Sequence, residues 1–311
     1  MRNLEGQGAQ QLDRTRKLIA APTLWWDRLL LMQPAWLPTL LLIPLLYAAG
    51  WLLGLPLVGL GLPLDQHALM GTLISVLLLL LLLPSWCRLR WNSRFCWRSL
   101  GLRRGGHEGQ RRLVPALLRG LLLALLLLTL VTLPLLLGSW AHWLGEWSLL
   151  RSLNALALLL GVGIVEELIF RAWLWRELDR WIGPAAAVAV QALIFSLVHT
   201  RFNLGFWPML SLLIGLMLLG LCLAAQRRLD GGSLWGCVGL HGGLVAGWFL
   251  LQNGLLQLSP DAPGWLVGPG GPAANPLGGA IGLAGLMLLL LIQLTAVARA
   301  ARPATGARKA S

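Results

Sequence analysis

Residues 68–87 read ALMGTLISVLLLLLLLPSWC, a stretch of twenty residues without one charged side chain. A transmembrane helix needs about 20 mainly apolar residues to cross a hydrocarbon core of about 30 Å. The run LLLALLLL at 121–128 has the same character. Leucine runs of this kind would aggregate if they were exposed to water. The sequence therefore predicts helices that cross a membrane.

The composition of the whole chain also indicates a membrane protein. Of its 311 residues, 57% are hydrophobic and 12% are charged, whereas soluble domains carry about 25% charged residues. This composition excludes a soluble globular enzyme, a disordered chain and a nucleic-acid-binding chain, so we expect no nucleic-acid partner. The net charge of +13 is typical of the excess of basic residues in the cytoplasmic loops of membrane proteins.

Apolar runs of spanning length occur eight times along the chain. The candidate spans are 36–60, 68–87, 113–137, 153–173, 185–200, 204–225, 233–252 and 277–298. We therefore expect an all-α polytopic membrane helix bundle of about eight transmembrane helices. Residues 12–32 mix charged and apolar side chains, which favours an interfacial helix. We expect no cleavable signal peptide.

The basic residues predict how the bundle is oriented. In an eight-span arrangement, the basic segments fall on one side of the membrane, including eight arginines between 88 and 112. The opposite loops hold only Arg151 and Arg201. Because basic loops remain in the cytoplasm, we expect both termini there, in a multi-pass protein of the cell (inner) membrane.

These observations divide the chain into five segments. They are a cytoplasmic or interfacial segment 1–35, N-terminal transmembrane helices 36–150 with a basic cytoplasmic loop 88–112, a central group of helices 151–255, a loop and last transmembrane helix 256–298, and a basic cytoplasmic tail 299–311. The four cysteines have no CxxC spacing, so we expect them to be small packing residues.

Two adjacent acidic residues interrupt the fourth span, which reads GVGIVEELIFR over 161–171. A carboxylate in mid-membrane costs about 2.5–3.5 kcal/mol on insertion scales. Glu167 and Arg171 are one helical turn apart in the favourable order for an ion pair, so we expect their side chains to pair. Glu166 has no such neighbour in the sequence, and the second charge therefore indicates a functional site.

Two histidines are the expected partners of this doublet. Glu167 lies 16 residues before the helix break at Gly183 and His199 lies 16 residues after it. In an antiparallel hairpin, both then lie about 24 Å from the turn and level with each other. His241 lies about ten residues after the turn at 230–232 and reaches a similar level if the first hairpin protrudes into the cytosol. The remaining histidines, His67, His107 and His142, fall in expected loops, away from the glutamate doublet.

Carboxylates beside imidazoles allow two kinds of hydrolysis. A glutamate and a histidine can activate water as a general base. Alternatively, Glu167, His199 and His241 can bind zinc or another divalent metal with an open position for water, which leaves the other glutamate as the base. Ser196 lies near His199, but the surrounding sequence has no nucleophile elbow, which disfavours a serine mechanism.

The residues of this cluster resemble the motifs of a known family. They form a Glu-Glu-x-x-x-Arg motif, a Phe-x-x-x-His motif and a later histidine, at Glu166, Glu167, Arg171, Phe195, His199 and His241. The pattern, within about 150–255, is similar to the CAAX protease and bacteriocin-processing (CPBP, or Abi) family of intramembrane proteases, which includes the Ras- and a-factor-converting enzyme. The resemblance implies that residues 151–255 form a four-helix catalytic core built from spans four to seven. It also implies that Glu166 activates water with help from His199, that Glu167 and His241 complete the site, and that Arg171 and Phe195 support it.

One position departs from the family pattern. The third motif of the family commonly reads HxxxN, and this chain has Val245 four residues after His241. Gln252 lies about 16 Å further along the same helix face, and Asn253 is no better placed. The resemblance implies that the substrate is a membrane-embedded or lipidated protein or peptide, such as a prenylated CAAX protein. A non-catalytic immunity factor or membrane scaffold, and a transporter that uses the glutamates as proton carriers, stay open as alternatives.

Overall fold

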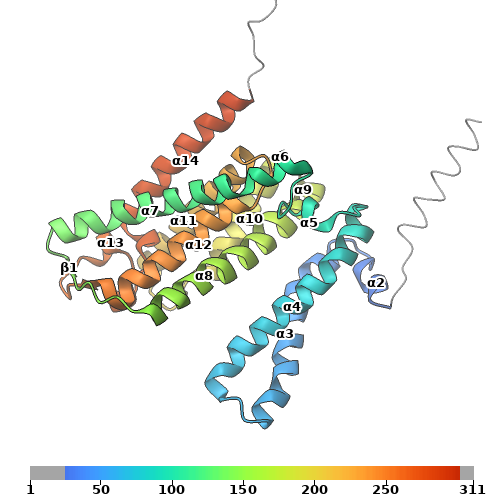
Figure 1. Cartoon of the computed structure of the whole chain (residues 1–311), viewed down its shortest axis with the longest axis horizontal. Helices are drawn as coiled ribbons and strands as arrows, with labels where there is room; N and C mark the ends of the chain where they lie inside the picture. Colours follow the sequence, from blue (N-terminus) through green and yellow to red (C-terminus); the bar gives the residue numbers. More distant parts are fainter. Residues whose placement is uncertain (1–24, 302–311) are drawn as a thin grey trace, which may run out of the picture. The chain divides into compact units, whose positions relative to one another are not determined.

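The computed structural model describes residues 25–301, so the interfacial helix expected at 12–32 and the tail expected at 299–311 lie largely outside the described residues. Helices make up nearly all of the regular structure (Figure 1). This confirms the predicted all-α polytopic membrane bundle. The chain divides into two compact units, Met1–Ser99 and Leu100–Ser311.

The first unit is a helical hairpin with short helices beside its chain ends. Its helices are α2 Trp25–Leu30, α3 Leu37–Gly59, α4 Leu64–Trp91 and α5 Cys96–Ser99. Close packing of α3 on α4 requires glycine, because a Cβ atom on Gly50 would lie 2.2 Å from the Ser75 hydroxyl oxygen. An ion pair between Asp27 Oδ2 and Arg88 Nη2, at 2.9 Å, holds α2 to α4.

His67 does not lie in a loop, and that expectation was wrong. It lies in the first turn of α4, because the helix begins before the apolar run that defined the predicted span. Its side chain is buried, and its Nε2 atom lies 3.1 Å from the carbonyl oxygen of Trp51 on α3. His67 is a packing residue of the hairpin.

The second unit contains the remaining helices and a small sheet. Its α-helices are α6 Gly106–Arg111, α7 Leu113–Leu137, α8 Leu149–Glu167, α9 Trp175–Ile182, α10 Pro184–His199, α11 Phe206–Leu229, α12 Trp235–Leu250, α13 Gly264–Val267 and α14 Ala280–Ala300. Two π-helices and two 3-10 helices connect them, at η1 Leu168–Leu174, η2 Leu251–Leu255, η3 Gly271–Ala273 and η4 Pro276–Gly278. The strands β1 Ala141–Trp143 and β2 Leu256–Leu258 pair antiparallel. His107 lies in α6 and His142 in β1, so the expectation that these two histidines lie in loops was also wrong.

Helix α12 runs through the interior of this unit between α7 and α8. Glycines allow the backbones to approach closely. A Cβ atom on Gly239 would lie 2.3 Å from the Leu117 carbonyl oxygen of α7, and one on Gly242 would lie 2.4 Å from the Leu159 carbonyl oxygen of α8. Small residues at helix contacts are the usual means of close packing in membranes. The glycines beside His241 therefore determine how near the site histidine comes to α8.

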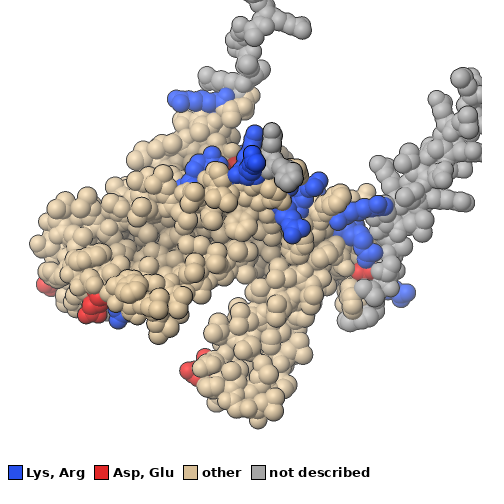
Figure 2. Space-filling view, in the orientation of Figure 1, with Lys and Arg blue, Asp and Glu red and all other residues tan. Residues whose placement is uncertain are grey.

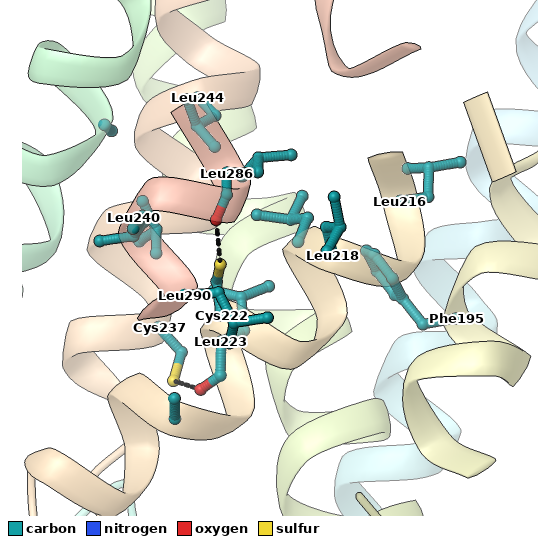
Figure 3. Packing of buried hydrophobic residues seen from close by; sticks show 14 of the residues in the cluster. Phe195, Leu216, Leu218, Cys222, Leu223, Cys237, Leu240, Leu244, Leu286 and Leu290 are labelled. Carbon is teal, nitrogen blue, oxygen red and sulfur yellow. Dashed lines mark hydrogen bonds between the residues drawn. The ribbon is translucent and has the colours of Figure 1, made fainter. Parts of the chain in front are cut away.

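Buried apolar side chains from α7, α10, α11, α12 and α14, most of them leucines, pack around this central helix (Figure 3). The cluster also contains two buried cysteines. The Cys222 thiol donates to the Leu286 carbonyl oxygen at 3.4 Å, and the Cys237 thiol donates to the Leu223 carbonyl oxygen at 3.2 Å. Both cysteines are free, as expected for packing residues.

Six helical segments of the described residues are long and apolar enough to cross a membrane. They are Leu37–Gly59, Leu64–Trp91, Gly109–Leu137, Leu149–Ile182, Phe206–Leu229 and Ala280–Ala300. The two other predicted spans correspond to α10 and α12, which have 16 residues each. Many leucines on the outer faces of the long helices are exposed, as lipid-facing side chains are in a membrane protein.

The two ends of the second unit differ in charge. Arg180 of α9 and Arg227 and Arg228 of α11 lie in the last turns of their helices, at what we call the arginine end. The sheet of β1 and β2 lies at the opposite end, which we call the strand end. Figure 2 shows the same separation, with Lys and Arg gathered beside α6 and acidic side chains beside β1.

A buried carboxylate contacts two helices at the arginine end. Asp230, directly after α11, forms an ion pair with Arg119 of α7 and accepts a hydrogen bond from Gln226 Nε2 at 2.9 Å. Burial raises the pKa of the Asp230 carboxyl above its ordinary value, although both partners stabilise the charged form. Asp230 therefore holds together the ends of α7 and α11.

Candidate active site

The glutamate doublet lies where α8 changes its winding. Helices α8, η1 and α9 form one continuous rod over Leu149–Ile182, longer than the predicted span 153–173. Within η1, the Trp175 N–H donates to the carbonyl oxygen of Phe170, five residues earlier. Single π turns of this kind are frequent at functional sites. The sequence of this segment has no feature that predicts the change.

Glu166 faces both histidines. Its Oε2 atom lies 3.0 Å from His199 Nε2 and 3.7 Å from His241 Nε2. The side chains of Glu166 and His199 are 24% and 29% exposed, although Oε2 itself is buried, so water or a substrate can reach the outer atoms of this pair. Three helices thus place their polar groups around one carboxylate oxygen.

Glu167 points to different partners and is fully buried. Its Oε1 atom accepts a hydrogen bond from His241 Nδ1 at 2.8 Å and lies 3.3 Å from Arg171 Nη1. The ion pair predicted from the one-turn spacing of Glu167 and Arg171 is confirmed. Glu167 therefore binds the Nδ1 side of His241, whereas Glu166 lies on the Nε2 side of both imidazoles.

Hydrogen bonds define which nitrogen of each imidazole is available. His199 Nδ1 lies 2.7 Å from the Phe195 carbonyl oxygen, and because a carbonyl only accepts, this nitrogen carries a proton. The remaining His199 Nε2 and the Glu166 carboxylate must then share one proton across their contact. In the same way, His241 Nδ1 donates to Glu167, which leaves His241 Nε2 free to face Glu166.

Phe195 is the apolar centre of the site. Its ring lies 4.5 Å from the His199 ring and 5.5 Å from the His241 ring, between centroids. The Arg171 guanidinium carbon lies 4.0 Å from the centre of the same ring, within the range of a cation–π contact. Phe195 therefore orients both imidazoles and covers the buried cation.

The alternative with a metal ion requires Glu167, His199 and His241 to face a common point. Glu167 turns toward Arg171 and His241, whereas His199 Nε2 turns toward Glu166. Within residues 25–301, no group of three His, Cys, Asp or Glu side chains is arranged to hold a metal ion. The predicted ligand set does not fit this geometry, since Glu167 and His199 face different partners.

The polar residues near the third motif face away from the glutamates. Val245 stands where the family commonly has asparagine. Gln252 Nε2 donates to the Ala274 carbonyl oxygen at 2.9 Å, and Asn253 Nδ2 donates to the Phe249 carbonyl oxygen at 2.8 Å. Ser196 donates to the Leu213 carbonyl oxygen at 2.9 Å, so its hydroxyl is also engaged within the helix packing.

Arg227 is a residue of the site region that the sequence does not reveal. Its guanidinium, from α11, donates to the backbone carbonyl oxygen of Arg171 in the π turn. It also lies 5.4 Å from the ring of Trp175. In the sequence, Arg227 reads as one more basic residue after an apolar run. Only the tertiary contact indicates that it stabilises the turn next to the glutamates.

Two family comparisons match the chain, one within each unit. Residues 147–247 match the family described as type II CAAX prenyl endopeptidase Rce1-like, and residues 15–95 match a domain of unknown function, DUF8676. A search of the curated proteins and a search of the solved structures each found no match. The first match contains both glutamates and both histidines and confirms the family resemblance over about a third of the chain.

Proposed function

We propose, from the premise that residues 147–247 belong to the Rce1-like family of type II CAAX prenyl endopeptidases, that the chain is an intramembrane endopeptidase. The observation that carries the proposal is the position of Glu166 Oε2, which lies 3.0 Å and 3.7 Å from the two imidazole Nε2 atoms. A carboxylate that shares a proton with an imidazole, in a partly open site, is suited to take a proton from water.

Hydrolysis would proceed as follows at these atoms. Water approaches Glu166, its oxygen adds to the carbonyl carbon of the substrate, and its proton passes to the Glu166–His199 pair. When the C–N bond breaks, the same proton goes to the leaving amine, and a carboxylic acid and an amine result. His241 Nε2, held by Glu167 through the opposite nitrogen, is placed to hydrogen-bond the developing oxyanion when it is protonated.

The substrate class follows from the surroundings of the site. All four side chains belong to helices of a membrane bundle, so a substrate must reach them from the bilayer or its surface. We infer a membrane-embedded or lipidated protein or peptide, and the family description makes prenylated CAAX peptides the first probe to use.

Conversion of Glu166 to glutamine tests the proposed reaction. The purified chain in proteoliposomes is given a farnesylated CAAX peptide and its unlipidated counterpart, and products are identified by mass spectrometry. We expect Glu166→Gln to reduce cleavage at least about 100-fold, the lower range for a general base, with unchanged folding. Asp65→Asn makes the same chemical change in the first unit and should leave the rate unaltered. Equal rates for Glu166→Gln and the parent chain would refute the role of Glu166.

A non-catalytic role is the second candidate, and Val245 favours it. Gln252 and Asn253, the amides that follow Val245 in the sequence, do not replace the missing asparagine, because they are bonded elsewhere. A scaffold or immunity factor of the same family would bind its partner without cleaving it. Binding that persists in Glu166→Gln, together with no cleavage by the parent chain, would support this second candidate.

A further inference from the structure

A large cavity opens at the strand end of the second unit, apart from the glutamates and histidines. Its volume is about 1500 Å³, and its walls come from the start of α11, from η2 and β2, and from the α13–η4 segment. Small-molecule pockets usually enclose about 300–1000 Å³. The cavity is therefore large enough for a polymer segment.

One wall of the cavity is a strand with an unused edge. Ser259 N–H donates to the Trp140 carbonyl oxygen, and Leu144 N–H donates to the Leu255 carbonyl oxygen. Since bonded and non-bonded pairs alternate in antiparallel strands, Gln257 also faces β1, and the backbone groups of Leu256 and Leu258 face away from β1.

The groups on that edge have few partners. The Leu256 N–H donates to the Leu251 carbonyl oxygen. The N–H and C=O of Leu258 and the C=O of Leu256 have no hydrogen-bond partner within residues 25–301. Leu256 and Leu258 both line the cavity, but Leu256 is buried and Leu258 is partly exposed, so Leu258 is the residue with which an incoming chain can pair. Backbone donors and acceptors on an open strand edge are matched by the backbone of another extended chain, whereas an acyl chain offers them no hydrogen bond.

The cavity lies on the same side of the bundle interior as the glutamate site. Ser196 of α10 bonds to Leu213 of α11, so in these antiparallel helices His199 is level with residue 210. Ser211, the next residue, already lines the cavity. Gln252 of the cavity wall lies in η2, directly after α12, 11 residues beyond His241, which is about 16 Å further along the helix axis.

The geometry points to a binding site for an extended peptide segment on the free edge of β2. The inference rests on the proposed function, because it assigns the cavity to the part of the substrate that lies about five residues from the cleaved bond. That number follows from the rise of about 3.3 Å per residue in a strand and the separation of about 16 Å along α12 and η2 between His241 and Gln252. Substrate main chain would then be recognised by strand addition, and apolar side chains would fill the cavity.

A proline at residue 258 tests this assignment, because it removes the free N–H and leaves the N–H groups that pair with β1. The chain carries Glu166→Gln to prevent turnover and a photoreactive benzoylphenylalanine at Gln257, an exposed residue of β2. The probe is a biotinylated twelve-residue peptide of alternating valine and threonine, added to the full chain in lipid nanodiscs. We expect Leu258→Pro to raise the half-saturating peptide concentration at least fivefold. The control Leu258→Ala keeps the N–H and should shift it less than twofold.

A second measurement leaves the protein unchanged at Leu258. A fully N-methylated peptide with the same side chains has no backbone N–H to donate, and we expect it to cross-link at least tenfold less. Equal cross-linking of both peptides, or cross-linking to lipid alone, overturns the assignment. If the peptide cross-links as expected but the parent chain cleaves nothing, the proposed protease activity fails while the binding site stands. If the parent chain cleaves its substrate but the peptide does not cross-link, the binding site on β2 is refuted and the protease activity stands.

Discussion

Replacement of Glu167 by glutamine would leave the Arg171 cation without its carboxylate in a fully buried position. An unpaired buried charge costs about 3–5 kcal/mol. We therefore expect Glu167→Gln to lower the stability of the bundle by roughly this amount, measured by thermal or denaturant unfolding in detergent. Glu166 is partly exposed, so Glu166→Gln should change stability far less.

The double variant Glu167→Gln with Arg171→Gln provides the control for this prediction. It removes both charges, and much of the lost stability should return, because a neutral pair need not be desolvated as ions. If the double variant is as unstable as the sum of the two single variants, the two charges do not stabilise each other. In that case, pairing with Arg171 would not explain why the Glu167 carboxylate is buried.

At the scale of helices, Gly242→Ala tests how closely α8 and α12 must pack. The new Cβ atom would lie 2.4 Å from the Leu159 carbonyl oxygen, so the helices must separate. Overpacking typically costs about 1–3 kcal/mol, and the contact between Glu167 and His241 should lengthen. We expect lower stability and slower cleavage. Gly161→Ala is the matched control, because nothing lies within 4 Å of its Cβ position, and alanine in a helix stabilises by about 0.5–1 kcal/mol.

Helix periodicity and length predicted part of this arrangement. The leucine runs predicted the spans, and the equal distances of Glu167 and His199 from Gly183 predicted that they lie level. The π turn at Leu168–Leu174 could not be predicted, because its residues are ordinary helix formers and only the tertiary contact from Arg227 indicates why it is stable. The pairing of β1 with β2 was also missed, since three-residue strands are too short to show an alternating pattern.

At the scale of the whole molecule, the distribution of arginines predicts that residue 105 faces the cytoplasm. A Gly105→Cys variant should react with a membrane-impermeant maleimide only from the cytoplasmic side, and Asp261→Cys only from the other side. Both residues are exposed, and the four native cysteines are buried, so background labelling should be low. Labelling of residue 105 from outside intact cells would reverse the proposed orientation.

The length of α10 has a consequence for the lipid around the site. Its 16 residues measure about 24 Å, about 6 Å less than a hydrocarbon core of about 30 Å, and His199 is the last residue of the helix. Such hydrophobic mismatch is relieved when the bilayer thins around the short element. Headgroups and water are then drawn toward His199 and Glu166 on this face. The acyl-chain length of the membrane thereby becomes a determinant of how readily water and substrate meet at the glutamate.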